Sequence, residues 1–151
     1  MHHWKSLVFF LALVFAAAAI GSTAVPDAWF ASLMKPSFNP PNWIFAPVWT
    51  VLYVFMAIAA WRVYRVVGAR AAVILWTAQL LCNAIWSPLF FGLHRIDLAL
   101  ADILLLLALV VATIIAFFRY DRGAGILLLP YAGWVAFATL LNFSFWQLNP
   151  Q

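Results

Sequence analysis

The chain alternates five long apolar segments with shorter stretches that carry most of its charges. Each segment is about twenty residues long, the length that an α-helix needs to cross a bilayer. None shows the ten-residue alternation of a barrel strand, and a lipid-exposed backbone must satisfy its own hydrogen bonds, so helices are expected. The pattern predicts one all-α domain over residues 1–151, an integral membrane bundle with spans at 4–21, 44–64, 69–92, 98–118 and 125–148.

Composition supports a membrane protein and excludes soluble classes. Of the 151 residues, 68% are hydrophobic and 8% are charged, whereas a soluble domain has about a quarter of its residues charged. Five spans leave no room for a nucleic-acid-binding domain, despite the net charge of +4. The single cysteine, Cys82, excludes an internal disulfide and lacks a neighbouring base, and no Cys/His spacing indicates a metal site.

The basic residues predict an orientation. With five spans, Lys35 and Arg95 lie on one face, and the other face carries Lys5, Arg62, Arg65, Arg70, Arg119 and Arg122. By the positive-inside rule, the amino terminus is expected in the cytoplasm, with loop 22–43 and the carboxyl terminus on the opposite side.

The first segment has a second interpretation, as a signal peptide, because His2, His3 and Lys5 precede its apolar core. The core is long for a signal peptide, and Ala17 and Gly21 form a small-residue pair suited to close helix packing. A retained first helix is therefore favoured.

Loop 22–43 is the one long connection, and it is rich in proline at positions 26, 36, 40 and 41. Proline at this density favours an extended, semi-rigid conformation. Because a long loop in a small protein is usually functional, the segment is predicted to be a lid.

Polar and aromatic residues recur at one depth below this loop. Trp49, Asn83, Trp86, Asp102 and Asn142 lie about five to nine residues inside their spans, roughly 7 to 14 Å at 1.5 Å per residue. Helical spacing places side chains on common faces, in the sets Trp49 and Tyr53; Asn83, Trp86 and Ser87; and Trp134, Ala138, Leu141 and Asn142. The spacing predicts a pocket beneath the lid.

Each of these groups also has a purely structural interpretation. Asparagines can join helices, and tryptophans can form interfacial belts, which is the assignment for Trp4, Trp29, Trp43 and Trp146. Asp102 is either a proton relay or ligand contact, or structural, and the structural role is favoured. His94 is expected to be an exposed loop residue. Pro88 and Pro130 are expected to kink their helices.

Four runs of sequence carry a resemblance to a known family: KPSFNPPNW at 35–43, PVWTVLY at 47–53, NAIWSPLFFG at 83–92 and PYAGWVAFATLLN at 130–142. They closely resemble the runs of the TspO/MBR family of tryptophan-rich sensory proteins. The resemblance covers nearly the whole chain. It implies a five-helix fold, often dimeric, with a pocket under the first loop that binds porphyrins such as protoporphyrin IX and, in animal members, cholesterol and synthetic drugs.

The resemblance also implies the residues of the pocket. By motif, they are Trp49, Tyr53, Asn83, Trp86, Trp134, Ala138 and Leu141, with Phe30 and Pro40 from the loop above. Phe30 stands where other members carry tyrosine, so a phenolic hydroxyl has no role there. The end of the last span lacks the tyrosine and basic residue of the proposed sterol motif, and specific cholesterol binding is not expected.

Three function classes follow. The first is a tetrapyrrole-binding sensor or transporter, with protoporphyrin IX or haem as ligand and with Asn83 or Lys35 receiving its propionates. The second is a light- and oxygen-dependent porphyrin-degrading enzyme that would use Trp49 and Trp134. The third is a small multidrug or ion carrier, for which Asp102 lacks a cationic partner. The first is favoured, with no obligatory cofactor, the lipid bilayer and a second copy of the chain as partners, and no nucleic acid.

Overall fold

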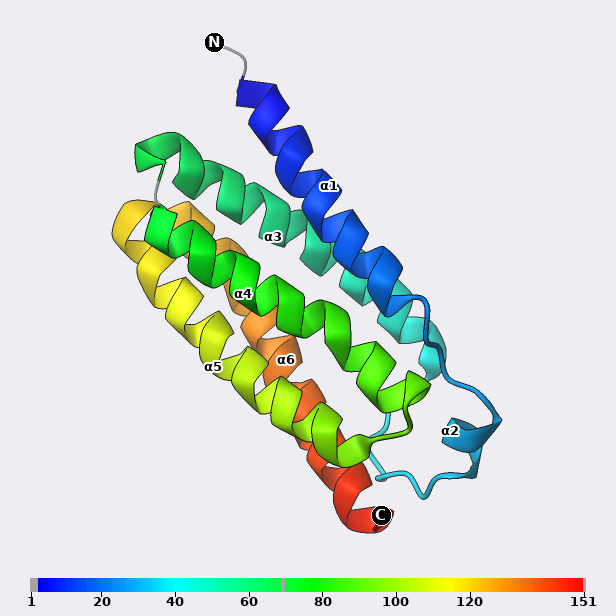
Figure 1. The fold of residues 1–151 in the computed structure, drawn as a ribbon. Coiled ribbons are helices and arrows are strands. Elements are labelled where there is room, and N and C mark those ends of the chain that lie inside the picture. Colours follow the sequence, from blue (N-terminus) through cyan, green and yellow to red (C-terminus); the bar gives the residue numbers. More distant parts are fainter. Residues whose placement is uncertain (1–2, 69, 151) are drawn as a thin grey trace.

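Long helices make up most of the structure, a computed structural model that describes residues 3–68 and 70–150 (Figure 1). Five helices in these ranges are long and apolar enough to cross a membrane, which confirms the predicted all-α class. They are α1 (His3–Gly21), α3 (Phe45–Val67), α4 (Arg70–Ser87), α5 (Ile96–Tyr120) and α6 (Arg122–Leu148), and three short elements, α2 (Ala28–Ser32), η1 (Asn42–Ile44) and η2 (Pro88–Gly92), complete the fold.

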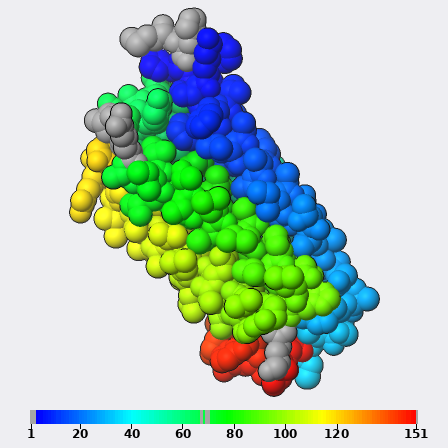
Figure 2. All heavy atoms as spheres, in the orientation of Figure 1, coloured from blue at the N-terminus to red at the C-terminus, as the bar shows by residue number. Residues whose placement is uncertain are grey.

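The long helices pack in the spatial order α1, α3, α6, α5, α4 and back to α1. Their shared core contains small residues on α3, where Ala57 and Ala60 are fully buried. Small side chains let neighbouring helices approach closely, which is how helices associate when water is absent. Trp76 fills the adjoining space and donates its indole N–H to the Met56 carbonyl at 3.1 Å. In the space-filling view the bundle is one elongated body (Figure 2).

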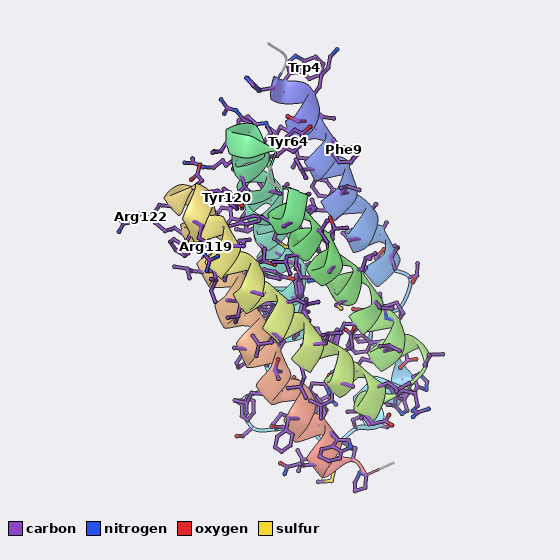
Figure 3. All side chains as sticks on the ribbon, turned by 60° about the vertical axis from the view of Figure 1, so that its left-hand side comes forward. Trp4, Phe9, Tyr64, Arg119, Tyr120 and Arg122 are labelled. Carbon is purple, nitrogen blue, oxygen red and sulfur yellow. The ribbon has the colours of Figure 1, made fainter. Side chains whose placement is uncertain are left out.

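The two ends of the bundle differ in charge. The start of α1, the α3–α4 connection and the α5–α6 connection share one end, and α2 and the carboxyl terminus share the other. Figure 3 shows Arg119 and Arg122 at the same end as Trp4 and Tyr64. This is the grouping of basic residues on which the orientation prediction rests. His2 lies outside the described residues.

The start of α6 differs from the prediction because a polar residue caps the helix. α6 begins at Arg122 rather than near 125, since the Asp121 carboxylate accepts the backbone N–H of Ala124 at 3.0 Å. Arg62 of α3 pairs with Asp121 at 3.0 Å and holds the pKa of that carboxyl below its ordinary value. At the end of α4, Pro88 begins a π-helical turn, whereas α6 continues as a helix through Pro130.

Loop 22–43 is more ordered than the extended segment that was predicted. It contains the one-turn helix α2, whose first turn is capped by Asp27 through a hydrogen bond from the Phe30 backbone N–H at 3.1 Å. The four prolines all lie outside α2, so they do not oppose it. The loop ends in the 3₁₀ turn η1, which leads directly into α3.

Candidate functional site

A cavity of about 700 Å³ lies between the loop and the five long helices. α1 contributes Phe15 and Ala18 to its lining, and α5 contributes Ile103 and Leu106. Most other lining residues belong to α3, α4, η2, α6 and the loop, which covers the cavity. This volume falls in the range of roughly 300–1,000 Å³ that is typical of small-molecule sites.

Aromatic rings form much of the cavity wall. The Trp49 ring meets the Trp134 ring edge to face at a centroid distance of 6.4 Å, and it lies 5.5 Å from the Tyr53 ring. Across the cavity lining, Trp86 stacks on Phe90 at 5.1 Å. Flat rings held by their neighbours offer extended apolar surfaces to a flat ligand.

The polar atoms of the lining belong to neutral side chains. Among the described residues no Asp, Glu, Lys, Arg or His lines the cavity, and no group of three or more metal-binding side chains is present. Tyr53 donates its hydroxyl to Asn83 Oδ1 at 2.7 Å. Asn142 Oδ1 accepts the Trp86 indole N–H at 2.9 Å, while Asn142 Nδ2 donates to the Ile96 carbonyl at 3.1 Å. Asn142 therefore joins three elements as well as lining the cavity.

Phe30 of α2 forms part of the cavity roof. It is 7% exposed, and its ring contacts those of Phe91 and Phe145 at 5.3 Å and 5.6 Å. The Lys35 ammonium lies 4.9 Å from the Phe30 ring centre and donates to the carbonyls of Phe30, Ala31 and Leu33 at 3.1 to 3.3 Å. All three N–H groups of the Lys35 ammonium therefore donate to backbone carbonyls at the end of α2.

Two sets of contacts fasten the loop to the bundle. The Asp27 carboxylate lies 3.3 Å from His94 Nε2, and the Trp29 ring stacks on the His94 ring at 4.2 Å. The Phe30 backbone N–H, and then His94, lower the pKa of Asp27. Farther along, the Met34 N–H donates to Asn149 Oδ1 at 2.9 Å and Asn149 Nδ2 donates to the Met34 carbonyl at 2.8 Å. We call this second contact the Asn149 clamp.

Comparison with known proteins identifies the family. The model of the TspO/MBR family matches residues 7–147. The chain belongs to this family. It is 42% identical to a tryptophan-rich sensory protein of Cereibacter sphaeroides over 97% of this chain and 92% of the relative. It is 40% identical to protein CrtK of Rhodobacter capsulatus, covering 96% and 95%, and to the translocator protein of Bos taurus, covering 80% and 75%. The protein is thus an integral, multi-pass membrane protein.

In this TspO/MBR protein, the structure brings ten of the sequence-predicted site residues together around the cavity. They are Phe30, Trp49, Tyr53, Asn83, Trp86, Ser87, Trp134, Ala138, Leu141 and Asn142. Pro40 is not among the lining residues, whereas its neighbours Asn39 and Asn42 are. Contact of any of these residues with a ligand remains a prediction.

Sequence reasoning missed several lining residues. Phe45 and Phe91 lie four residues from Trp49 and Ser87, so helical spacing could have found them. Phe15 and Ala18 had no such signal, because every face of α1 is apolar. Asp102, expected at the same depth, does not line the cavity.

The structure shows specific contacts for two loop residues. His94 is partly exposed, and it also pairs with Asp27 and stacks on Trp29. The Trp29 ring packs on His94 and on Phe90 of η2, and its assignment to an interfacial belt stays a prediction. The exposures of Trp4 (60%) and Trp43 (73%) fit the belt assignment.

Proposed function

We propose that the cavity binds a tetrapyrrole such as protoporphyrin IX, and that the protein acts as a membrane sensor or transporter for it. The observation that carries this proposal is an uncharged, aromatic cavity of about 700 Å³ between membrane-spanning helices and beneath an anchored loop. A planar macrocycle gains both apolar burial and ring contacts in such surroundings. The names of the relatives, a sensory protein and a translocator protein, favour sensing or transport.

The polar groups suggest how such a ligand would lie. Because no cation among the described residues lines the cavity, the apolar body of a porphyrin suits the cavity, and its propionates suit the mouth near the loop amides Asn39 and Asn42. Lys35 is a weaker candidate for the propionates than its sequence position suggests, since its ammonium already caps α2.

The test measures how four leucine variants bind protoporphyrin IX in the dark. Quenching of tryptophan fluorescence reports the binding. Trp49→Leu and Trp134→Leu should each lose about 0.5–1.5 kcal/mol of aromatic contact beyond area burial. Trp4→Leu and Trp146→Leu are the matched controls, because both rings are exposed and lie outside the cavity lining. Their affinities should stay close to that of the wild type, and circular dichroism should show all four folded.

Two results would contradict this proposal. Equal losses at all four positions would indicate nonspecific partitioning of porphyrin, and no loss at Trp49 or Trp134 would place the site elsewhere. Repeating the titration under light tests the enzymatic alternative. Steady porphyrin absorbance supports a binder, whereas bleaching that disappears in the Trp49 and Trp134 variants would make the protein an enzyme.

A further inference from the structure

A chain of four hydrogen-bonded side chains runs from the cavity wall into the centre of the bundle. Tyr53 donates to Asn83 Oδ1 at 2.7 Å, and Asn83 Nδ2 donates to the Tyr131 hydroxyl at 2.9 Å. Tyr131 in turn donates to Gln79 Oε1 at 2.6 Å. Tyr53 and Asn83 line the cavity, whereas Tyr131 and Gln79 are each 1% exposed. Every donor in the chain therefore points away from the cavity, toward Gln79.

Beyond Gln79, the structure holds two buried atoms of opposite hydrogen-bonding character. Among the described residues, Gln79 Nε2 and Asp102 Oδ2 are the buried side-chain atoms that have no hydrogen-bond partner. One is a donor and the other an acceptor, and leaving either unpaired in apolar surroundings is costly. Asp102 of α5 lies close enough to Tyr131 of α6 and Cys82 of α4 to interact electrostatically with both, and Tyr131 is the residue that donates to Gln79.

We propose that Asp102 is a proton-binding site that sets the direction of this hydrogen-bond chain. Its protonation thereby decides whether the Tyr53 hydroxyl donates a hydrogen bond into the cavity. An ionised carboxylate only accepts hydrogen bonds, so it favours the arrangement in which Gln79 offers its amide nitrogen to Asp102. Gln79 then accepts from Tyr131 through Oε1, which is the hydrogen bond that the structure contains. A protonated Asp102 instead donates to Gln79 Oε1, and Gln79 Nε2 donates to Tyr131. Tyr131 then donates to Asn83 Oδ1, and Asn83 Nδ2 donates to the Tyr53 oxygen. The Tyr53 hydroxyl is then free to donate a hydrogen bond into the cavity.

The surroundings of Asp102 single out its carboxyl as the acidic group of this cluster. The titratable groups near it are Cys82 from α4, Tyr131 from α6 and, through Asn83, Tyr53 from α3, and η2 contributes none. No ion pair joins Asp102 to a basic side chain in the described ranges. Asp102 is partly exposed and lies about 9 Å along α5 from its start at 1.5 Å per residue. The end of the bundle that carries the loop is therefore the nearer of the two ends from which a proton would reach Asp102.

The proposal fixes the sign of a pH effect. A ligand that presents a hydrogen-bond acceptor to Tyr53 binds more tightly when Asp102 is protonated. By linkage, binding of that ligand must draw a proton onto Asp102 from solution. The choice of ligand rests on the proposed function, because a porphyrin ester carries acceptor oxygens and ring nitrogens.

The experiment uses protoporphyrin IX dimethyl ester, which has no free carboxyl group, and purified protein in weakly buffered detergent with a pH indicator. The wild type should take up protons on binding, and its dissociation constant should fall at least about five-fold from about pH 8 to about pH 5. Asp102→Asn should take up no protons and bind with a pH-independent constant. Asp97→Asn is the matched control, the same replacement on α5 at a residue paired with Arg95, and it should behave as the wild type does.

A second variant separates the proton site from its coupling to the cavity. Gln79→Leu keeps the Asp102 carboxyl but interrupts the chain, so its porphyrin affinity should no longer depend on pH. Infrared titration of ligand-free protein should still show the C=O stretch of a protonated carboxylic acid in this variant and should lose it in Asp102→Asn. The infrared signal needs no porphyrin, so a probe that fails to bind would refute the proposed function and leave the proton site testable. A pH-independent wild-type affinity, or a pH dependence that survives in Asp102→Asn, would overturn the inference.

Discussion

The Asn149 clamp should control how often the loop opens. Asn149 follows α6, and its amide makes both hydrogen bonds that a peptide group would make to the Met34 backbone, at 2.8 and 2.9 Å. Asn149→Ala removes this pair and also the hydrogen bond from Asn149 Nδ2 to the Phe145 carbonyl at 3.0 Å, while the backbone N–H of Asn149 still donates to that carbonyl. The carbonyl at the end of α6 therefore keeps one partner, whereas the loop loses both of its hydrogen bonds to the Asn149 side chain.

The size of the effect on the loop follows from the two hydrogen bonds that the loop loses. Each contributes about 0.5–1.5 kcal/mol net, and both lie at the exposed end of the bundle, so about 1–2 kcal/mol is expected for the pair. A change of this size raises the population of the open loop by a factor of about 5–30. The Asp27–His94 contact remains in the variant, which limits the opening to the second half of the loop.

Hydrogen exchange of the loop amides, followed by mass spectrometry, measures this opening directly. Peptides that contain Met34 should exchange about 5–30 times faster in Asn149→Ala, and bound porphyrin should dissociate faster. Gln147→Ala is the control, because Gln147 is exposed on the same helix and makes no side-chain hydrogen bond within the described ranges. Unchanged exchange at Met34, or an equal increase in the control, would refute the clamp.

Three further predictions concern the loop, the packing and the topology. Replacing Pro40 and Pro41 together by glycine should destabilise the closed loop by about 0.4–1 kcal/mol per site and weaken porphyrin binding in a titration; unchanged affinity would contradict a lid. Gly125→Ala should lower the thermal stability of the protein in detergent, because the new Cβ would lie 2.5 Å from the Phe118 ring; an unaltered melting temperature would show that this ring moves aside freely. A reporter fused after Gln151 should be non-cytoplasmic and one in the α3–α4 connection cytoplasmic; the reverse pattern would refute the positive-inside assignment.

The long helices and much of the cavity could be predicted because they depend on local sequence. Segment length and hydropathy determine which stretches cross the membrane, and a spacing of three or four residues determines which side chains share a face. Trp49 and Tyr53 are one such pair, and both line the cavity. The family motifs added Phe30, which spacing alone did not indicate.

The contacts of the loop could not be predicted because they join residues far apart in the sequence. Met34 and Asn149 are separated by 115 positions, and Asp27 and His94 by 67. Neither pair has a pattern that a window of sequence can reveal. The helix α2 depends partly on such contacts, since one turn of helix is not stable alone. Proline content suggested an extended loop, but hydrogen bonds that Asp27 and Lys35 form with the two ends of α2 stabilise a short helix instead.

The bilayer explains why charged and neutral polar groups take different places in this protein. Charges are costly between membrane-spanning helices. The charged side chains of Asp27 and Lys35 lie outside them and hold the loop, whereas Asp102 lies within α5. Inside, the cavity wall relies on hydroxyl and amide groups such as Tyr53 and Asn83, which can each donate or accept. Affinity should therefore depend mainly on the aromatic walls and on the direction of the neutral hydrogen bonds. Access should depend on the polar contacts of the loop, so variants of the two regions should change different measured constants.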